Sequence, residues 1–193
     1  MLAFSQPTYV FRRAEEAEAG LVNYLRLASL VCLEMPSRSL DAVRTVISGL
    51  PDVDPALVAS GRYFVADLDG ELIGGAGWSV LPLGYRGDRL LGEDGLPTQL
   101  RLGGDAVLIR GFFLDPDGGR RGAAASLLAH VEADVLRAGY RVADTIGPAT
   151  SQVYYRGLGF KAVRKLQLRL DRDDRLPMLQ MRKCLSLRLA LAA

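Results

Sequence analysis

The chain has 193 residues, of which 49% are hydrophobic, so it can bury the core of one full domain and disorder is not expected. The 24 Lys and Arg residues against 22 Asp and Glu leave a net charge of +2, too weak a field to favour nucleic acid. One His and two distant cysteines, Cys32 and Cys184, lack the spacing of metal ligands. We therefore expect a single domain over residues 1–193, with no metal, no nucleic-acid partner, and both thiols reduced and buried.

The start of the chain lacks the basic and then apolar pattern of a signal peptide. No stretch reaches the roughly 18 consecutive apolar residues of a membrane span. A cytoplasmic protein without a membrane partner is expected. The apolar end from Leu185 to Ala193 is a candidate contact for a homodimer.

Three elements are predicted in the first part of the chain. The side chains from Thr8 to Arg12 alternate in character along the chain, which predicts a short strand. Ala14 to Met35 then predicts a long helix, because its apolar residues recur at helical spacing. Pro36 ends this helix, and Leu40 to Leu50 predicts a second one.

A hairpin and a loop are predicted next. Two antiparallel strands are expected at Arg62–Leu68 and Glu71–Leu81, because Asp69-Gly70 between them suits the positive φ angles of a tight turn. The glycine-rich stretch over 83–104 interrupts the regular pattern and is interpreted as a long loop. Such a loop is a place where a lid or acceptor specificity could reside.

The second half of the chain begins with a predicted central strand, because Ala106 to Leu114 is a nearly continuous apolar run typical of a strand covered on both faces. From Arg121 the apolar residues recur at helical spacing until Gly139, which is placed to cap that helix. A strand, a short helix and two further strands are predicted at Arg141–Ile146, Ala149–Gly157, Phe160–Leu170 and Met178–Leu185. This order of elements predicts a mixed α/β fold.

A glycine-rich turn leads from the central strand into the helix, so the N–H groups of the first helical turn would point out of it. Glycines let the backbone approach a phosphate, the helix dipole favours negative charge, and two arginines add charged contacts. The glycine spacing fits neither a Walker loop nor a dinucleotide fingerprint. The alternative is a plain turn with solvated arginines. The predicted anion site comprises Gly118, Gly119, Arg120, Arg121, Gly122, Ala123, Ala124 and Ala125.

Two motifs occur here, Gly119-Arg120-Arg121-Gly122-Ala123-Ala124 and Tyr154-Tyr155-Arg156-Gly157-Leu158-Gly159-Phe160. They resemble motifs A and B of the GCN5-related N-acetyltransferase (GNAT) superfamily, which read Gln/Arg-x-x-Gly-x-Gly/Ala and an aromatic-Tyr pair followed by Leu-Gly-Phe. The first departs from the family pattern, since Gly119 stands where Gln or Arg is usual. The resemblance extends from Tyr9 to about Leu185 and implies a mostly antiparallel central sheet of about seven strands flanked by helices.

The resemblance also implies acetyl-CoA as co-substrate and direct transfer of its acetyl group to an amine of a small molecule or peptide. In such folds the pantothenate arm lies beside the central strand, which would place Phe112, Phe113 and Leu114 along it. Tyr155 matches the residue that returns a proton to the departing thiolate, and a phenol with a pKa of about 10 is protonated at neutral pH. The alternative is that Tyr154 and Tyr155 only pack the short helix on the sheet.

The acceptor side departs from the family's usual pattern. Many members have a glutamate base on the central strand, whereas the matching positions here are Arg110 and Gly111. The base therefore stays open, as does the length of the acyl group, and one alternative function is a non-catalytic CoA-binding sensor or interaction module. Arg110 is expected either to pair with a neighbouring acid or to bind a substrate carboxylate, because an arginine in an apolar strand is costly without a partner. Trp78 is expected either to line the acceptor pocket or to pack the core.

Overall fold

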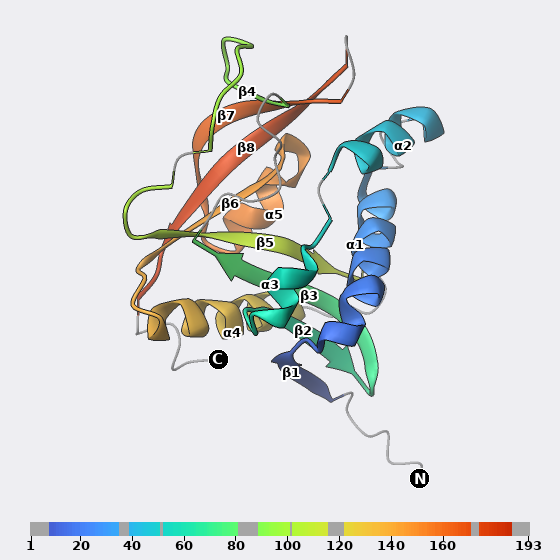
Figure 1. The fold of residues 1–193 in the computed structure, drawn as a ribbon, viewed down its shortest axis with the longest axis vertical. Coiled ribbons are helices and arrows are strands. Elements are labelled where there is room, and N and C mark those ends of the chain that lie inside the picture. Colours follow the sequence, from blue (N-terminus) through green and yellow to red (C-terminus); the bar gives the residue numbers. More distant parts are fainter. Residues whose placement is uncertain are drawn as a thin grey trace.

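The computed structural model describes residues 8–34, 39–50, 52–80, 89–100, 102–115, 122–170 and 174–186 (Figure 1). Its centre is an eight-stranded mixed sheet with the order β1-β2-β3-β5-β6-β8-β7-β4. Within these ranges, β5 and β6 form the only parallel pair, and the other neighbours are antiparallel. The strands are β1 (Tyr9–Arg13), β2 (Tyr63–Leu68), β3 (Glu71–Ser79), β4 (Leu90–Leu91), β5 (Ala106–Leu114), β6 (Val142–Pro148), β7 (Lys161–Arg169) and β8 (Arg175–Cys184).

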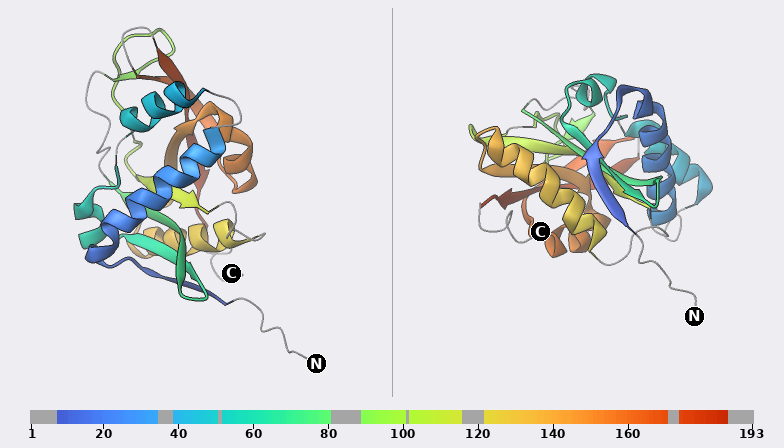
Figure 2. Two further views of the ribbon diagram at one scale, coloured as in Figure 1. Left: turned by 90° about the vertical axis from the view of Figure 1, so that its right-hand side faces the viewer. Right: turned by 90° about the horizontal axis from the view of Figure 1, so that it is seen from below.

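Helices cover both faces of the sheet. Figure 2 shows α1 and α2 on one side of the strands and α4 on the other. Helix α5 lies on the side of α4, because its Tyr155 shares a core cluster with Leu127 and Leu128 of α4. No helix in the described ranges is long and apolar enough to cross a membrane. The helical segments are η1 (Glu16–Glu18), α1 (Ala19–Glu34), α2 (Leu40–Gly49), α3 (Pro55–Ala59), α4 (Ala123–Arg137), η3 (Ala149–Ser151) and α5 (Gln152–Gly157).

The predicted mixed α/β fold and the order of its main elements are confirmed. The β2–β3 hairpin turns through Asp69 with φ 51° and Gly70 with φ 91°, as the tight-turn prediction requires. The predicted central strand has the same bounds as β5. Gly139, just beyond the C-cap of α4, has a φ of 95°, which a residue without Cβ adopts at little cost.

Three features differ from the sequence predictions. Helix α3 was not predicted, because five residues give no periodic signal; Pro55 at its first position and the side chain of Asp54, which accepts a 2.9 Å hydrogen bond from Ala56 N–H, begin it. The stretch interpreted as a loop over 83–104 contains β4, whose two leucines are buried and pair with β7. Cys32 and Cys184 are free thiols, but both are exposed rather than buried.

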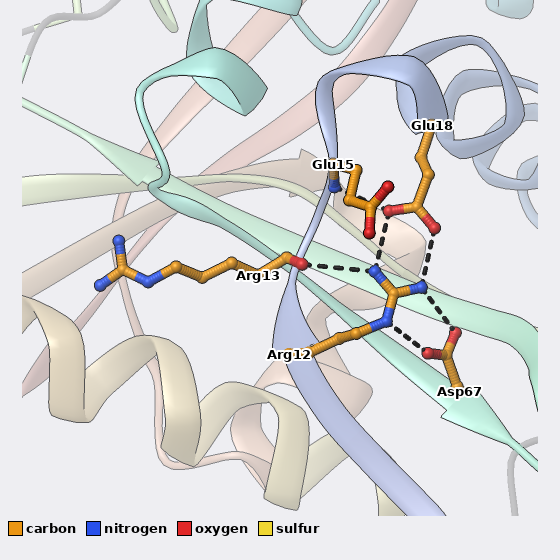
Figure 3. Close-up of polar contacts among 5 residues, drawn as sticks. All are labelled: Arg12, Arg13, Glu15, Glu18 and Asp67. Atoms are coloured by element: carbon orange, nitrogen blue, oxygen red, sulfur yellow. Dashed lines mark hydrogen bonds and ion pairs between the residues drawn. The ribbon is translucent and has the colours of Figure 1, made fainter.

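A cluster of charged residues, the Arg12 cluster, ties the start of the first helix to the edge of the sheet (Figure 3). It consists of Arg12, Glu18 and Asp67. Arg12 on β1 donates to Asp67 on β2, with Nε 2.7 Å from Oδ2, and to Glu18 in η1, with Nη2 2.7 Å from Oε1. Glu18 also accepts from the backbone N–H of Glu15 at 2.7 Å. The hydrogen bond from Arg12 is the main reason that the pKa of Glu18 is lowered. The cluster therefore fixes where the chain leaves the sheet and α1 begins.

We expect Glu18→Gln to lower the free energy of unfolding by about 1 kcal/mol at pH 7, the upper end for a solvent-screened ion pair. Because the folded-state pKa of Glu18 is lowered, its stabilisation is present above the unfolded value of about 4.3 and is lost as the pH falls through the folded value. Urea unfolding should therefore separate variant and wild type above about pH 4.3, and the two should converge as the pH falls through the folded-state pKa of Glu18. Glu16→Gln, which changes an exposed side chain in the same turn, is the matched control; an equal loss in both variants would contradict this role.

Candidate active site

The parallel strands β5 and β6 pair only over their first halves. Ala106–Ile109 pairs with Val142–Thr145, and the pairing of the described residues ends there. Figure 1 shows the two strands diverging from this point. A cavity of about 450 Å³ opens between them, with walls from residues 110–114 of β5, from Asp115 just after this strand, and from Thr145–Pro148 of β6. The opening is therefore built into the sheet itself.

A bulge in β5 begins where the two strands part. On the neighbouring strand β3, Gly77 lies opposite Arg110 and Gly75 lies opposite Phe113, so β5 has one more residue than β3 over this stretch. Gly111 within the bulge has a φ of 59°, a conformation that costs residues with a Cβ atom roughly 1–2 kcal/mol. The extra residue changes the direction of β5 and ends its pairing with β6.

The buried side chain of Tyr63 on β2 holds the bulge in place. Its hydroxyl donates a 2.7 Å hydrogen bond to the carbonyl oxygen of Gly111. Burial raises the pKa of the Tyr63 phenol, so the hydroxyl stays a donor. Its ring fits because β3 has no side chains here: Cβ atoms at Gly75 and Gly77 would lie 2.7 and 2.5 Å from Tyr63 atoms. A Cβ atom at Gly111 would lie 2.6 Å from Cγ2 of Val53, so the bulge requires glycine.

Helix α1 forms one wall of the cavity through Arg26, Ser29 and Leu30, which lie on one face of the helix. The Ser29 hydroxyl donates a 2.9 Å hydrogen bond to the carbonyl of Leu114, at the end of β5. This bond links α1 to the strand beyond the bulge. The helix is therefore held against the opening from both ends, since the Arg12 cluster fixes its start.

The segment between α2 and α3 is fastened to the same helix. The Asn23 side chain donates to the carbonyl of Val53 at 3.1 Å and accepts from its N–H at 2.7 Å. One turn further along α1, Arg26 Nη2 lies 3.5 Å from Asp52 Oδ1. These contacts bring Asp52 and Val53 into the wall of the cavity.

Aromatic rings line the other side of the opening. Tyr155 on α5 lies 6.1 Å from Phe112 and 5.8 Å from Phe160 between ring centroids, and Tyr154 lies 5.8 Å from Phe112. Tyr155 is only 9% exposed. This burial raises the pKa of its phenol, and a hydrogen bond with the Thr145 side chain acts more weakly in the opposite direction. The arrangement places a protonated phenol in the cavity wall at neutral pH.

The residues predicted to contact the cofactor fall into two groups. Phe112, Phe113 and Leu114 all line the cavity. The predicted contacts Gly119, Arg120 and Arg121 lie outside the described residues, as does Gly118. Gly122 precedes α4 with a φ of 103°, and Ala123, Ala124 and Ala125 form the first turn of this 15-residue helix.

Of the two residues predicted on the acceptor side, only Arg110 lines the cavity. Trp78 is 2% exposed, and its indole N–H donates a 2.9 Å hydrogen bond to Asp134 on α4. The guanidinium of Arg62 lies 4.6 Å above the indole ring. These contacts support the core-packing alternative for Trp78, because they direct the indole toward α4 and away from the opening.

Arg26 and Asp52 line the cavity but were not singled out in the sequence. Arg26 is the only basic residue within α1, which is a signal that a search for charges inside apolar helices would find. Asp52 has no comparable signal, because it lies between Pro51 and Pro55 in a segment that reads as a turn.

We expect Gly111→Ala to lower the free energy of unfolding by about 3 kcal/mol, because a Cβ atom adds both strain at positive φ and overlap with Val53. Gly104→Ala is the matched control, since a Cβ atom there meets no atom within 4 Å. Denaturant unfolding of both variants measures the difference. A loss in Gly111→Ala no larger than in Gly104→Ala would show that the bulge does not require glycine.

Solved structures share this fold at low sequence identity. An N-acetyltransferase from Thermoplasma acidophilum in complex with coenzyme A aligns with a TM-score of 0.61 at 12% identity, over 92% of this chain and 99% of its own. A GCN5-related N-acetyltransferase from Rhodopseudomonas palustris aligns with a TM-score of 0.62 at 17% identity, over 96% of this chain and 99% of its own. A proposed acetyltransferase from Salmonella typhimurium with its cofactor acetyl-CoA aligns with a TM-score of 0.57 at 14% identity, over 94% of this chain and 95% of its own. At such identities these likenesses establish the fold alone.

Sequence comparison identifies the family. No curated protein sequence matches the chain significantly. The family model described as "Acetyltransferase (GNAT) family" matches residues 33–160, which is more than half of the chain and includes β5, α4 and Tyr155. The chain therefore belongs to the acetyltransferase (GNAT) family, a family of acyltransferases.

Proposed function

We propose that this protein transfers the acetyl group of acetyl-CoA directly to an amine of a small molecule or peptide. The observation that carries the proposal is the cavity where β5 and β6 separate, with Tyr155 buried in its wall. Strands that stop pairing leave backbone N–H and C=O groups along their edges, and these suit the amide-rich pantetheine arm of coenzyme A. The solved structures that hold coenzyme A and acetyl-CoA support this choice of cofactor.

In this proposal the cofactor is held at two places. Phe112, Phe113 and Leu114 flank the pantetheine arm in the cavity. The diphosphate lies at the beginning of α4, where N–H groups of the first turn and the helix dipole favour an anion. The proposed diphosphate contacts are backbone groups of Gly119, Gly122, Ala123, Ala124 and Ala125 and the side chains of Arg120 and Arg121.

Tyr155 is the proposed general acid. Burial favours its protonated form, so the phenol has a proton to donate at neutral pH. As the acceptor nitrogen forms its bond to the acetyl carbon and the carbon–sulfur bond breaks, the Tyr155 hydroxyl gives this proton to the departing sulfur. Coenzyme A leaves as a thiol, and Tyr155 regains a proton from solvent.

The proton of the acceptor amine leaves by another route, because β5 contains no carboxylate between Ala106 and Leu114. Asp144 on β6 is fully buried, but it already accepts hydrogen bonds from Arg182 at 2.7 Å and Gln180 at 2.7 Å. The side chain of Asp52 is 72% exposed at the cavity wall. We therefore assign the proton to solvent that reaches the cavity beside Asp52.

Acetyl-CoA at about 100 times its dissociation constant should stabilise the protein by roughly 2.7 kcal/mol, measured by thermal unfolding with and without cofactor. No shift at millimolar acetyl-CoA would contradict the proposal. Release of free thiol in the presence of a broad panel of amines then separates an enzyme from a non-catalytic CoA-binding module, the alternative that the missing carboxylate on β5 favours. Stabilisation without thiol release from any amine would support that module.

We expect Tyr155→Phe to lower kcat by about 100-fold or more, the range for loss of a general acid, with the acetyl-CoA thermal shift nearly unchanged. Because the pKa of Tyr155 is raised, wild-type kcat should fall on the alkaline side only above about pH 10, and this fall should be absent in the variant. Tyr140→Phe, at a tyrosine that packs on Trp78 outside the cavity, is the control and should keep wild-type kcat. Equal kcat in Tyr155→Phe and wild type would remove Tyr155 from the mechanism.

A further inference from the structure

Thr145 on β6 is a buried polar residue that the proposed transfer step does not use. Ala143, Thr145 and Gly147 alternate along β6, so they share one face of the strand. Ala143 packs in the same core cluster as Tyr155, so this face is the one that α5 covers. Thr145 is 2% exposed and lines the cavity. A hydroxyl buried to this extent is costly unless it has a hydrogen-bond partner.

The Thr145 hydroxyl has a partner in the phenol of Tyr155, with which it shares a hydrogen bond. The Tyr155 ring lies directly against β6, because a Cβ atom at Gly147 would lie 3.1 Å from its Cε2 atom. The missing side chain of Gly147 therefore lets the ring approach the strand. On another side of the ring, Phe112 lies 6.1 Å away between centroids. These contacts hold the Tyr155 hydroxyl beside Thr145.

The titratable groups around this phenol are neutral, paired or exposed. Tyr154 lies 5.7 Å away between ring centroids, and burial raises its pKa to about 12, so it is uncharged at pH 7. Arg156, the next residue on α5, is exposed. Lys183 lies 5.8 Å from the ring centroid of Phe160 and pairs with Glu132. The described residues of the cavity wall further include two arginines and two aspartates, Arg26, Arg110, Asp52 and Asp115.

The hydrogen bond between Thr145 and Tyr155 gains strength during the proposed proton transfer. In the resting protein either hydroxyl can donate, because hydroxyl groups rotate to suit their partners. A phenolate has no proton to donate, so after the transfer Thr145 must be the donor. Hydrogen bonds to a charged acceptor are shorter and stronger than those between neutral groups. An interaction that is stronger in the transition state than in the resting state accelerates the reaction.

We infer that Thr145 is a positioning residue for Tyr155: its hydroxyl fixes the phenol and donates a hydrogen bond to the phenolate as the proton leaves. The inference rests on the proposed acetyl transfer and adds a residue of β6 to that site. The proton passes from the Tyr155 oxygen to the departing sulfur, and Thr145 keeps its own proton throughout. Tyr155 then regains a proton from solvent, which restores the resting pair.

The first test measures the acidity of Tyr155 without turnover. Thr145→Val keeps a branched side chain and removes the hydroxyl, so the acid dissociation constant of Tyr155 should fall about tenfold, the loss expected for a charge-assisted hydrogen bond. The readout is a fluorine NMR titration of cofactor-free protein that contains meta-fluorotyrosine, because fluorine brings the phenol into a measurable pH range. The resonance missing from Tyr155→Phe assigns the signal. Repeating the titration in a Tyr154→Phe background removes the neighbouring phenol.

The second test measures rates, with the amine that gives the fastest thiol release in a broad panel. Thr145→Val should lower kcat about tenfold, with the KM for acetyl-CoA nearly unchanged, and Thr145→Ser should restore most of the loss. In a Tyr155→Phe background, Thr145→Val should cause no further loss, because Thr145 acts through Tyr155. Thr45→Val is the matched control and should keep wild-type values, since Thr45 bonds to the Asp41 carbonyl on α2.

The outcomes separate this inference from the proposed function. A thermal shift with acetyl-CoA verifies that each variant folds. An unchanged acid dissociation constant in Thr145→Val would overturn the inference even with a lower kcat, because packing alone would then explain that loss. A loss of kcat that persists in Thr145→Ser, or that recurs in the Tyr155→Phe background, would also overturn it. Failure of acetyl-CoA to stabilise wild type would instead contradict the proposed function itself.

Discussion

The hydrogen bond from the Tyr63 hydroxyl to the Gly111 carbonyl is the contact on which the site depends. Parallel strands normally continue to pair, because each buried backbone group that loses its partner costs free energy. The bulge in β5 breaks this pairing after Ile109. The Tyr63 hydroxyl offsets part of the cost, because it donates a hydrogen bond to the carbonyl of Gly111 in the unpaired stretch. Glycines on β3 leave space for the Tyr63 ring, so the bulge in β5 depends on the residues of the neighbouring strand β3.

Helix α1 gives this opening a further wall and makes it a cavity. The Arg12 cluster holds its start, Asn23 holds its second turn, and Ser29 holds its second half through a hydrogen bond from its hydroxyl to the carbonyl of Leu114. Because the contacts of Asn23 also hold Val53, the segment between α2 and α3 moves into place with the helix. Each contact is polar and directional, so together they fix the helix in register with β5 as well as burying its apolar face.

Aromatic and charged side chains line different parts of the cavity. Tyr155 and Phe112 form an aromatic side in which burial keeps a phenol protonated. Arg110 and Arg26 line other parts of the wall, and Arg26 Nη2 lies 3.5 Å from Oδ1 of Asp52. In our proposal, solvent removes the proton of the acceptor amine, so this member of the acetyltransferase (GNAT) family does not need a glutamate base on β5.

The sequence by itself determined the mixed α/β class, the hairpin at Asp69-Gly70, the central strand and the family, because periodicity, turn chemistry and motifs depend on residues close together in the chain. It also selected Phe112 and Tyr155, which line the cavity. Only the tertiary structure decided that Trp78 turns toward α4 and that residues 26, 52 and 110 line one cavity. The reason is physical: those positions meet through the packing of α1 across β5 and a bulge held from another strand, and no local pattern encodes contacts between segments so distant in sequence.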